Sequence, residues 1–174
     1  MNFFMFYNST MIAIEELTIA EVHLSFKYGS YNCRQLIEAF LERIRKLDKN
    51  GPKLNSLLAH SGTALEEADR LDTFFKETGN LIGPLHGIPA IVKDQLDTKG
   101  IVTTYGSIVA KDHVPMEDAA VVTKLKQAGA IVLAKSTMPG ERPPQSLIPT
   151  LKKSRLGSWM AVYKFYIRLD EESL

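Results

Sequence analysis

Residues 83–100 read GPLHGIPAIVKDQLDTKG, and this stretch decides how the chain is interpreted. The apolar run over 88–92 predicts a buried strand, yet it ends on Lys93, which is followed at once by Asp94. Burying an ammonium group is costly unless the group is paired or neutralised. The end of this strand is therefore a candidate functional position.

The segment after Lys93 predicts a strand–helix–strand unit. Residues 95–117 are rich in turn-forming residues and predict a long irregular connection. Asp118 is expected to cap a helix that ends at Gly129, and 130–134 predict a second buried strand. The expected inward side chains of this helix are Val121, Val122, Leu125 and Ala128. Such a unit places two parallel strands side by side with right-handed connection, and functional groups gather at their carboxyl ends. Lys93 and Lys135 both fall there.

Three helices are predicted before this unit. Thr18 and Glu21 form a capping box, and Gly29 ends a helix of about ten residues. Asn32 begins a second helix, which ends near 50–52, and 53–60 predict a short strand. A third helix runs from about 63 to 79. The apolar positions that recur at helical spacing are Leu36, Ile37, Phe40, Leu41, Ile44 and Leu47 in the second helix, and Ala64, Leu65, Ala68, Leu71 and Phe75 in the third.

The composition excludes several classes of function. The chain has 174 residues, room for one domain or for a piece of a larger one, and a net charge of +1. This balance does not favour nucleic acid or a membrane as a partner. The single cysteine, Cys33, excludes an internal disulfide framework and a cysteine-rich metal site, and favours a cytoplasmic location.

The two ends of the chain differ from its middle. The first residues lack the basic region of a signal peptide, and no run approaches the roughly 20 apolar residues of a membrane span. The N-glycosylation sequon at 8–10 is attributed to chance. Beyond residue 139 the helical and strand patterns are lost, although 159–168 alternate like a strand. We therefore expect a variable N-terminus over 1–14, one folded unit over 15–141, and a disordered or irregular tail over 142–174.

Other candidate sites carry less weight. GAIVLAKST, at 129–137, comes within one residue of a phosphate-binding loop, but its spacers are a buried apolar run, so Lys135 is expected to reach solvent at a strand end. The four histidines have no metal-binding spacing, and His86 is expected to be a hydrogen-bonded structural residue. Cys33 could have a lowered pKa at a helix N-terminus, but an inert role is favoured. No metal and no cofactor are expected.

The residues alone leave three roles open for Lys93. It could reach solvent or pair with a carboxylate such as Asp94, which is the commonest outcome for a lysine at a strand end. It could form a Schiff base with a carbonyl substrate. With its pKa lowered by burial, it could also act as a general base towards a hydroxyl group.

Two long segments narrow this choice. GPLHGIPAIVKDQLDTKGIVTTYGS, at 83–107, and DAAVVTKLKQAGAIVLAKSTMPGE, at 118–141, closely resemble the N-terminal half of the amidase signature family. This family comprises serine amidohydrolases such as fatty-acid-amide hydrolases, indoleacetamide hydrolases and amidotransferase A subunits. Ala134 stands where the family usually has glycine. The resemblance covers about 15–141 and implies an α/β fold with N-terminal helices followed by an incomplete part of a mixed α/β/α sheet.

The resemblance also implies a catalytic role for Lys93. In the family a lysine, a bridging serine on a cis peptide and a nucleophilic serine hydrolyse the C–N bond of an amide, and the lysine of the KD motif corresponds to Lys93. The two serines and the oxyanion glycines follow in a GSSSGS-like stretch, and nothing comparable follows residue 139 here. The resemblance thus assigns a base to this chain without its nucleophile.

Three hypotheses follow from this departure. The first is the N-terminal part of an amidase acting on small-molecule amides, truncated and inactive by itself. The second is a non-catalytic fragment that associates with itself or with a full-length paralogue through an exposed sheet edge. The third is a truncated, non-functional product.

Overall fold

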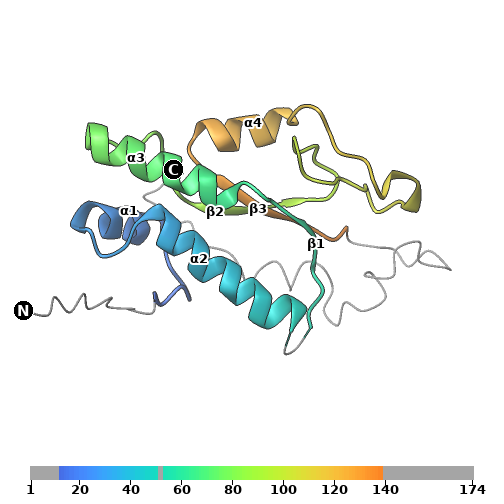
Figure 1. The fold of residues 1–174 in the computed structure, drawn as a ribbon, viewed down its shortest axis with the longest axis horizontal. Helices are drawn as coiled ribbons and strands as arrows, with labels where there is room; N and C mark the ends of the chain where they lie inside the picture. Colours follow the sequence, from blue (N-terminus) through green and yellow to red (C-terminus); the bar gives the residue numbers. More distant parts are fainter. Residues whose placement is uncertain (1–11, 51–52, 139–174) are drawn as a thin grey trace, which may run out of the picture.

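A mixed sheet of three strands lies at the centre of the fold (Figure 1). The computed structural model describes residues 12–50 and 53–138. The strands are β1 (Leu57–His60), β2 (Pro89–Lys93) and β3 (Ile131–Ser136), in the order β1-β3-β2. β2 runs parallel to β3, and β1 runs antiparallel to it. The strand–helix–strand unit predicted from the sequence is confirmed.

Four α-helices surround this sheet in the described part of the chain. They are α1 (Ile19–Tyr28), α2 (Cys33–Ile44), α3 (Ala64–Thr78) and α4 (Ala120–Gln127), and α2 continues into a π-helical turn, η1 (Arg45–Lys49). Both N-terminal helices begin with a reciprocal capping box, Thr18 with Glu21 and Asn32 with Gln35. Gly29 ends α1 in a left-handed conformation, as Gly79 ends α3.

The sheet separates two apolar clusters. The larger cluster joins β3 to α1, α2 and α3, and the smaller one joins it to the long connection and α4. Ile131 and Leu133 face the first cluster, whereas Val132 faces the second, because successive side chains of a strand point to opposite faces. Figure 1 shows α1 and α2 on one side of the sheet and α4 on the other. All six residues of β3 are buried, as the apolar run over 130–134 predicts for Ile131 to Ala134; Lys135 and Ser136 are buried as well.

Two of the predicted elements are wrong in detail. The first strand begins at Leu57 instead of residue 53, because Lys53 and Asn55 have positive φ angles of 51° and 49° that no strand contains. Asp118 does not cap α4, whose N-cap is Ala119. Val121, expected to face inward, is 46% exposed.

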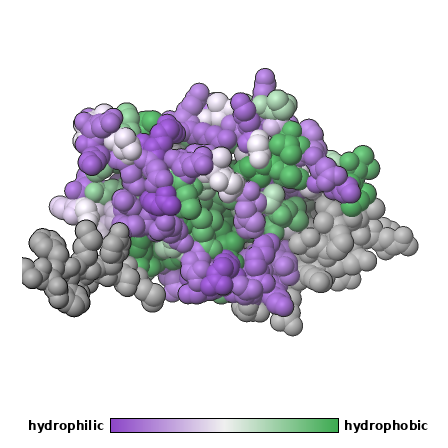
Figure 2. All heavy atoms as spheres, in the orientation of Figure 1, coloured by the Kyte–Doolittle hydropathy of each residue, from purple (hydrophilic) through white to green (hydrophobic). Residues whose placement is uncertain are grey.

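The described surface of the long connection carries apolar side chains. Ile108 and Val109 lie in a short 3-10 turn, η2 (Ile108–Ala110), and Val109 is 93% exposed; Val114 and Met116 follow on the same connection. Figure 2 shows hydrophobic side chains at the end of the molecule that this connection occupies in Figure 1. Of the helices that the structure describes, none has the length and apolar character needed to cross a membrane.

Several predictions for the chain ends lie outside the described residues. These are the sequon at 8–10, the irregular tail over 142–174 and the strand-like alternation over 159–168. They stay predictions, as does the three-part division of the chain.

Gly87 offers a direct test of the packing between the helices and the entry to β2. Its φ angle is +72°, and an added Cβ would lie 2.5 Å from the Sγ of Cys33 and 2.9 Å from the ring of Phe26. Gly79 has nearly the same φ angle, +68°, with nothing within 4 Å of an added Cβ. Gly79→Ala therefore introduces backbone strain alone, whereas Gly87→Ala introduces strain and a clash in the core.

We expect Gly79→Ala to lower the free energy of unfolding by about 1–2 kcal/mol, and Gly87→Ala by about 3 kcal/mol or more. Urea unfolding followed by circular dichroism measures both values. Equal losses in the two variants would contradict the close packing at Gly87.

Candidate active site

Lys93 lies at the carboxyl end of β2, where the sequence places it. In the parallel ladder it is paired in register with Ser136 of β3. Its Nζ donates a hydrogen bond to the carbonyl oxygen of Thr137, with 2.7 Å between the two atoms. The side chain is partly buried, and this burial lowers the pKa of the amine. A lysine in this state gives up its proton more readily than one in water.

Asp94 anchors the chain immediately beyond Lys93. Its backbone N–H donates to the carbonyl oxygen of Ser136, which extends the β2–β3 pairing by one residue. Its buried carboxylate accepts hydrogen bonds from the backbone N–H and the hydroxyl of Thr104, and from the N–H of Gly106. The N–H contacts are 2.9 and 3.2 Å long. Asp94 therefore ties the far part of the long connection back to the end of β2.

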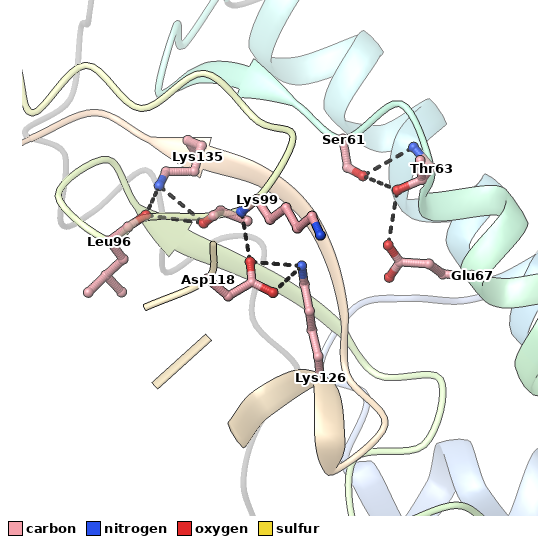
Figure 3. Close-up of polar contacts among 9 residues, drawn as sticks. Ser61, Thr63, Glu67, Leu96, Lys99, Asp118, Lys126 and Lys135 are labelled. Atoms are coloured by element: carbon pink, nitrogen blue, oxygen red, sulfur yellow. Dashed lines mark hydrogen bonds and ion pairs between the residues drawn. The ribbon is translucent and has the colours of Figure 1, made fainter. Parts of the chain in front are cut away.

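Lys135 does not reach solvent, contrary to the expectation from the sequence. Its residue exposure is 0%, and its Nζ donates to the carbonyl oxygen of Leu96 (Figure 3). It also donates to the hydroxyls of Thr98 and Thr103. The long connection folds over the end of β3 and covers the lysine, which an isolated strand does not reveal. Residues 131–136 form a strand, with a register shift against β2, and not a phosphate-binding loop, as expected.

Acidic side chains surround the long connection and Lys135. Burial lowers the pKa of Lys135, and the nearby carboxylates of Asp94, Asp97 and Asp118 act against this lowering. Asp118 also accepts from the backbone N–H of Lys99 at 2.7 Å and forms an ion pair with Lys126 at 2.8 Å (Figure 3). These contacts explain why Asp118 does not serve as a helix cap, since its carboxylate holds the connection against α4.

Sequence reasoning missed the roles of Thr98 and Thr103. Both are buried with an exposure of 0%, and both lie in DTKGIVTT, which the sequence indicates only as a turn-rich stretch. Three threonines within seven residues are a signal of buried polar contacts, because a threonine hydroxyl needs a hydrogen-bond partner when it is buried. Their partner, Lys135, is more than 30 residues away in the sequence, so no local pattern connects them.

The remaining candidate residues lie away from Lys93. His86 is a buried structural histidine, as expected, with Nδ1 accepting from the backbone N–H of Ile82 at 3.1 Å. Burial and the nearby Asp72 carboxylate raise the pKa of the Cys33 thiol, which is opposite to the lowering that a helix N-terminus favours. Within 12–50 and 53–138, no cluster of three or more histidine, cysteine, aspartate or glutamate side chains could hold a metal ion.

The family follows from a comparison with known proteins. The model of the family described as Amidase matches residues 35–141, which include both resembling segments, Lys93 and Lys135. This chain belongs to the amidase family.

Relatives of this amidase family chain cover most of it. It is 35% identical over 126 residues to a glutamyl-tRNA(Gln) amidotransferase subunit of Alkaliphilus metalliredigens, in an alignment with 72% of this chain and 25% of the relative. It is 49% identical over 77 residues to "Amidase 2" of Gibberella moniliformis, which covers 44% of this chain and 15% of that protein.

The fold is shared with solved amidase structures. The native peptide amidase from Stenotrophomonas maltophilia matches with a TM-score of 0.67 and 35% identity, over 71% of this chain and 25% of that one. An amidase family protein from Bacillus anthracis matches with the same TM-score and the same identity, over 72% of this chain and 25% of that one. This amidase family chain thus spans about a quarter of the length of these relatives, and the partial α/β fold predicted from the sequence is confirmed.

Asp94 provides a test of how the connection is held. In Asp94→Asn one carboxylate oxygen becomes an NH₂ group, which cannot accept from Thr104 or Gly106. We expect the free energy of unfolding to fall by about 1–3 kcal/mol, because a buried donor is left without its acceptor. Urea unfolding measures the loss, and hydrogen exchange locates it at the amides of these two residues.

The matched control is Asp112→Asn on the same connection. The Asp112 side chain is 85% exposed, and its ion pair with Lys111 is 3.6 Å long. We expect a change within about 0.5 kcal/mol. A similar effect in both variants would mean that Asp94 contributes only surface charge.

Proposed function

We propose that this chain supplies the general base, Lys93, of an amidase that hydrolyses the C–N bond of a carboxylic amide, and that the chain is inactive by itself. The single observation that carries the assignment is the position of Lys93. It stands at the carboxyl end of a parallel strand, partly buried, with its pKa lowered, inside the segment that the family model matches. A lowered pKa enlarges the neutral fraction of the amine, and only the neutral form can accept a proton.

The proposed reaction uses a Ser/cis-Ser/Lys triad. Neutral Lys93 takes the proton of a bridging serine, which in turn takes the proton of the nucleophilic serine as it attacks the amide carbonyl. The C–N bond then breaks, the proton passes to the leaving ammonia or amine, and water hydrolyses the acyl-enzyme. Backbone N–H groups stabilise the oxyanion. The 174 residues contain no GSSSGS-like stretch to supply these serines.

The identity of the amide is left at its chemical class. The substrate is a small molecule with a carboxylic amide, and the single cysteine favours a cytoplasmic location. The proposal involves neither nucleic acid nor a membrane as a partner, in accordance with the near-neutral charge of +1.

The state of Lys93 can be tested without turnover. Acetic anhydride labels only the neutral amine, so the pH dependence of labelling at each lysine, read by mass spectrometry, gives its titration midpoint. We expect Lys93 in the native chain to label with a midpoint at lower pH than the same residue in urea, because burial disfavours the ammonium form. Identical midpoints in the two states would remove the basis for the general-base role.

The catalytic role is tested in a complete active site. Residues 83–141 replace the corresponding segment in the peptide amidase from Stenotrophomonas maltophilia, which contributes the rest of the chimera. We expect the chimera to hydrolyse its amide substrate and Lys93→Met to lower kcat about 10²- to 10⁴-fold, the usual contribution of a general base. Lys111→Met, in the exposed connection, is the control and leaves kcat unchanged. Retained turnover in Lys93→Met would refute the proposal.

The 174-residue chain is assayed in parallel on aliphatic, aryl and indole acetamides. We expect no turnover, because a triad without its nucleophile loses most of the chemical acceleration. Turnover that Lys93→Ala abolishes would contradict the inactivity of the isolated chain and point to a substitute nucleophile.

A second candidate function is docking onto a complete amidase of the same family. Among the described residues, each outer strand, β1 and β2, pairs only with β3, so each has an edge that could accept another strand. The long connection after β2 also exposes the apolar side chains of Val109 and Met116. Size-exclusion chromatography and a pull-down with a full-length paralogue test the idea. A stable monomer that does not bind the paralogue would exclude it.

A further inference from the structure

The hydrogen-bond partners of Lys135 suit a protonated amine. An ammonium group has three N–H donors, and Nζ contacts three acceptors: the carbonyl of Leu96 and the hydroxyls of Thr98 and Thr103, the latter two at 3.3 and 3.1 Å. A neutral amine would instead need a donor for its lone pair. The Thr98 hydroxyl donates to Leu96 and the Thr103 hydroxyl donates to Ile101, so both hydroxyls meet Nζ as acceptors.

The charge of this buried group is balanced at longer range. Burial disfavours the charged form of Lys135, whereas the carboxylates of Asp94, Asp97 and Asp118 favour it, although in the described part of the chain none of them forms an ion pair with it. Removing one acceptor from a buried ammonium group is costly, because water can replace that acceptor only if the structure opens. The buried ammonium therefore favours the closed arrangement of the connection.

The three acceptors belong to the segment that follows Lys93 directly. The Leu96 N–H donates to the carbonyl oxygen of Lys93 at 3.0 Å, which closes a turn at the end of β2. The Leu96 carbonyl on the same turn accepts from Lys135. Lys135 of β3, the neighbouring strand, thus holds the turn that follows Lys93. Asp94 holds the far side of the same connection by accepting a hydrogen bond from the Thr104 N–H.

We propose that Lys135 is a positioning residue, whose buried ammonium holds the 96–103 connection closed and thereby keeps the Lys93 amine at the carboxyl end of β2 in its partly buried place. Without this ammonium, the connection opens and Lys93 becomes more hydrated. Its value to catalysis rests on the proposed role of Lys93, but the structural coupling between the two lysines does not.

The test compares Lys135→Met with Lys126→Met in the full 174-residue chain. Methionine has a similar length but no charge and no donor. Lys126 is the matched control because its replacement by methionine also removes one positive charge near the connection, where Lys126 forms an ion pair with Asp118. Hydrogen exchange compares the protection of the amides in 96–106 with that of the amides in α1–α3. Acetic anhydride labelling measures the titration midpoint of the Lys93 amine.

In Lys135→Met we expect amide protection over 96–106 to fall on the order of tenfold or more, while α1–α3 keep theirs, because the opening is local. The labelling midpoint of Lys93 moves to higher pH, since hydration relieves the burial that lowers it. Lys126→Met changes neither quantity at Lys93 or Leu96. Unaltered Lys93 titration in Lys135→Met, or an equal loss of protection throughout α1–α3, overturns the proposal.

A milder pair of variants covers the case in which Lys135→Met fails to fold. Thr103→Val removes one acceptor and keeps the shape of the side chain, whereas Thr103→Ser keeps the hydroxyl. We expect the shift at Lys93 and the local loss of protection in Thr103→Val, and neither in Thr103→Ser. Equal behaviour of the two variants overturns the proposal. These measurements need no turnover, so retained turnover in the Lys93→Met chimera would refute the general-base role of Lys93 and leave this coupling intact.

Discussion

The structure depends on the burial of β3 between two strands and two layers. Its six residues are all buried, and it pairs with β2 on one side and β1 on the other. A strand in this position can satisfy its backbone groups only through both neighbours, since no water reaches it. The parallel pairing fixes where β2 ends, and this in turn places Lys93 beside Ser136 and the Thr137 carbonyl.

Polar contacts, rather than apolar packing, determine the conformation of the connection beyond β2. Asp94 and Lys135 are both fully buried, and each contacts several groups of this connection. A buried carboxylate and a buried ammonium are tolerated only when nearly all of their hydrogen bonds are made. The connection therefore has few alternative conformations of similar energy, although it contains little regular secondary structure. This constraint explains how an irregular segment can hold a chemical group at a strand end.

Local patterns predict most of the elements correctly. Both capping boxes, the glycines that end α1 and α3, and the existence of the strands β2 and β3 depend on neighbouring residues, so the sequence shows them directly, although in β2 only Val92 is fully buried. Asp118 has the composition of a cap, but it meets the Lys99 amide and the Lys126 ammonium and holds the connection instead. The predicted start of β1 is wrong because the backbone of Lys53 and Asn55 is left-handed, which their side chains do not signal.

The sequence by itself determined the family, the strand–helix–strand unit and the position of Lys93 at a strand end, because an ordered motif and a hydrophobic period are local properties of the chain. Only the tertiary structure decided the environment of Lys135. From its neighbours it is a lysine after a strand, free to reach solvent. In the fold it is fully buried, because Leu96, Thr98 and Thr103 come over it from a distant segment. Burial and hydrogen-bond satisfaction depend on contacts between distant residues, and no local pattern contains them.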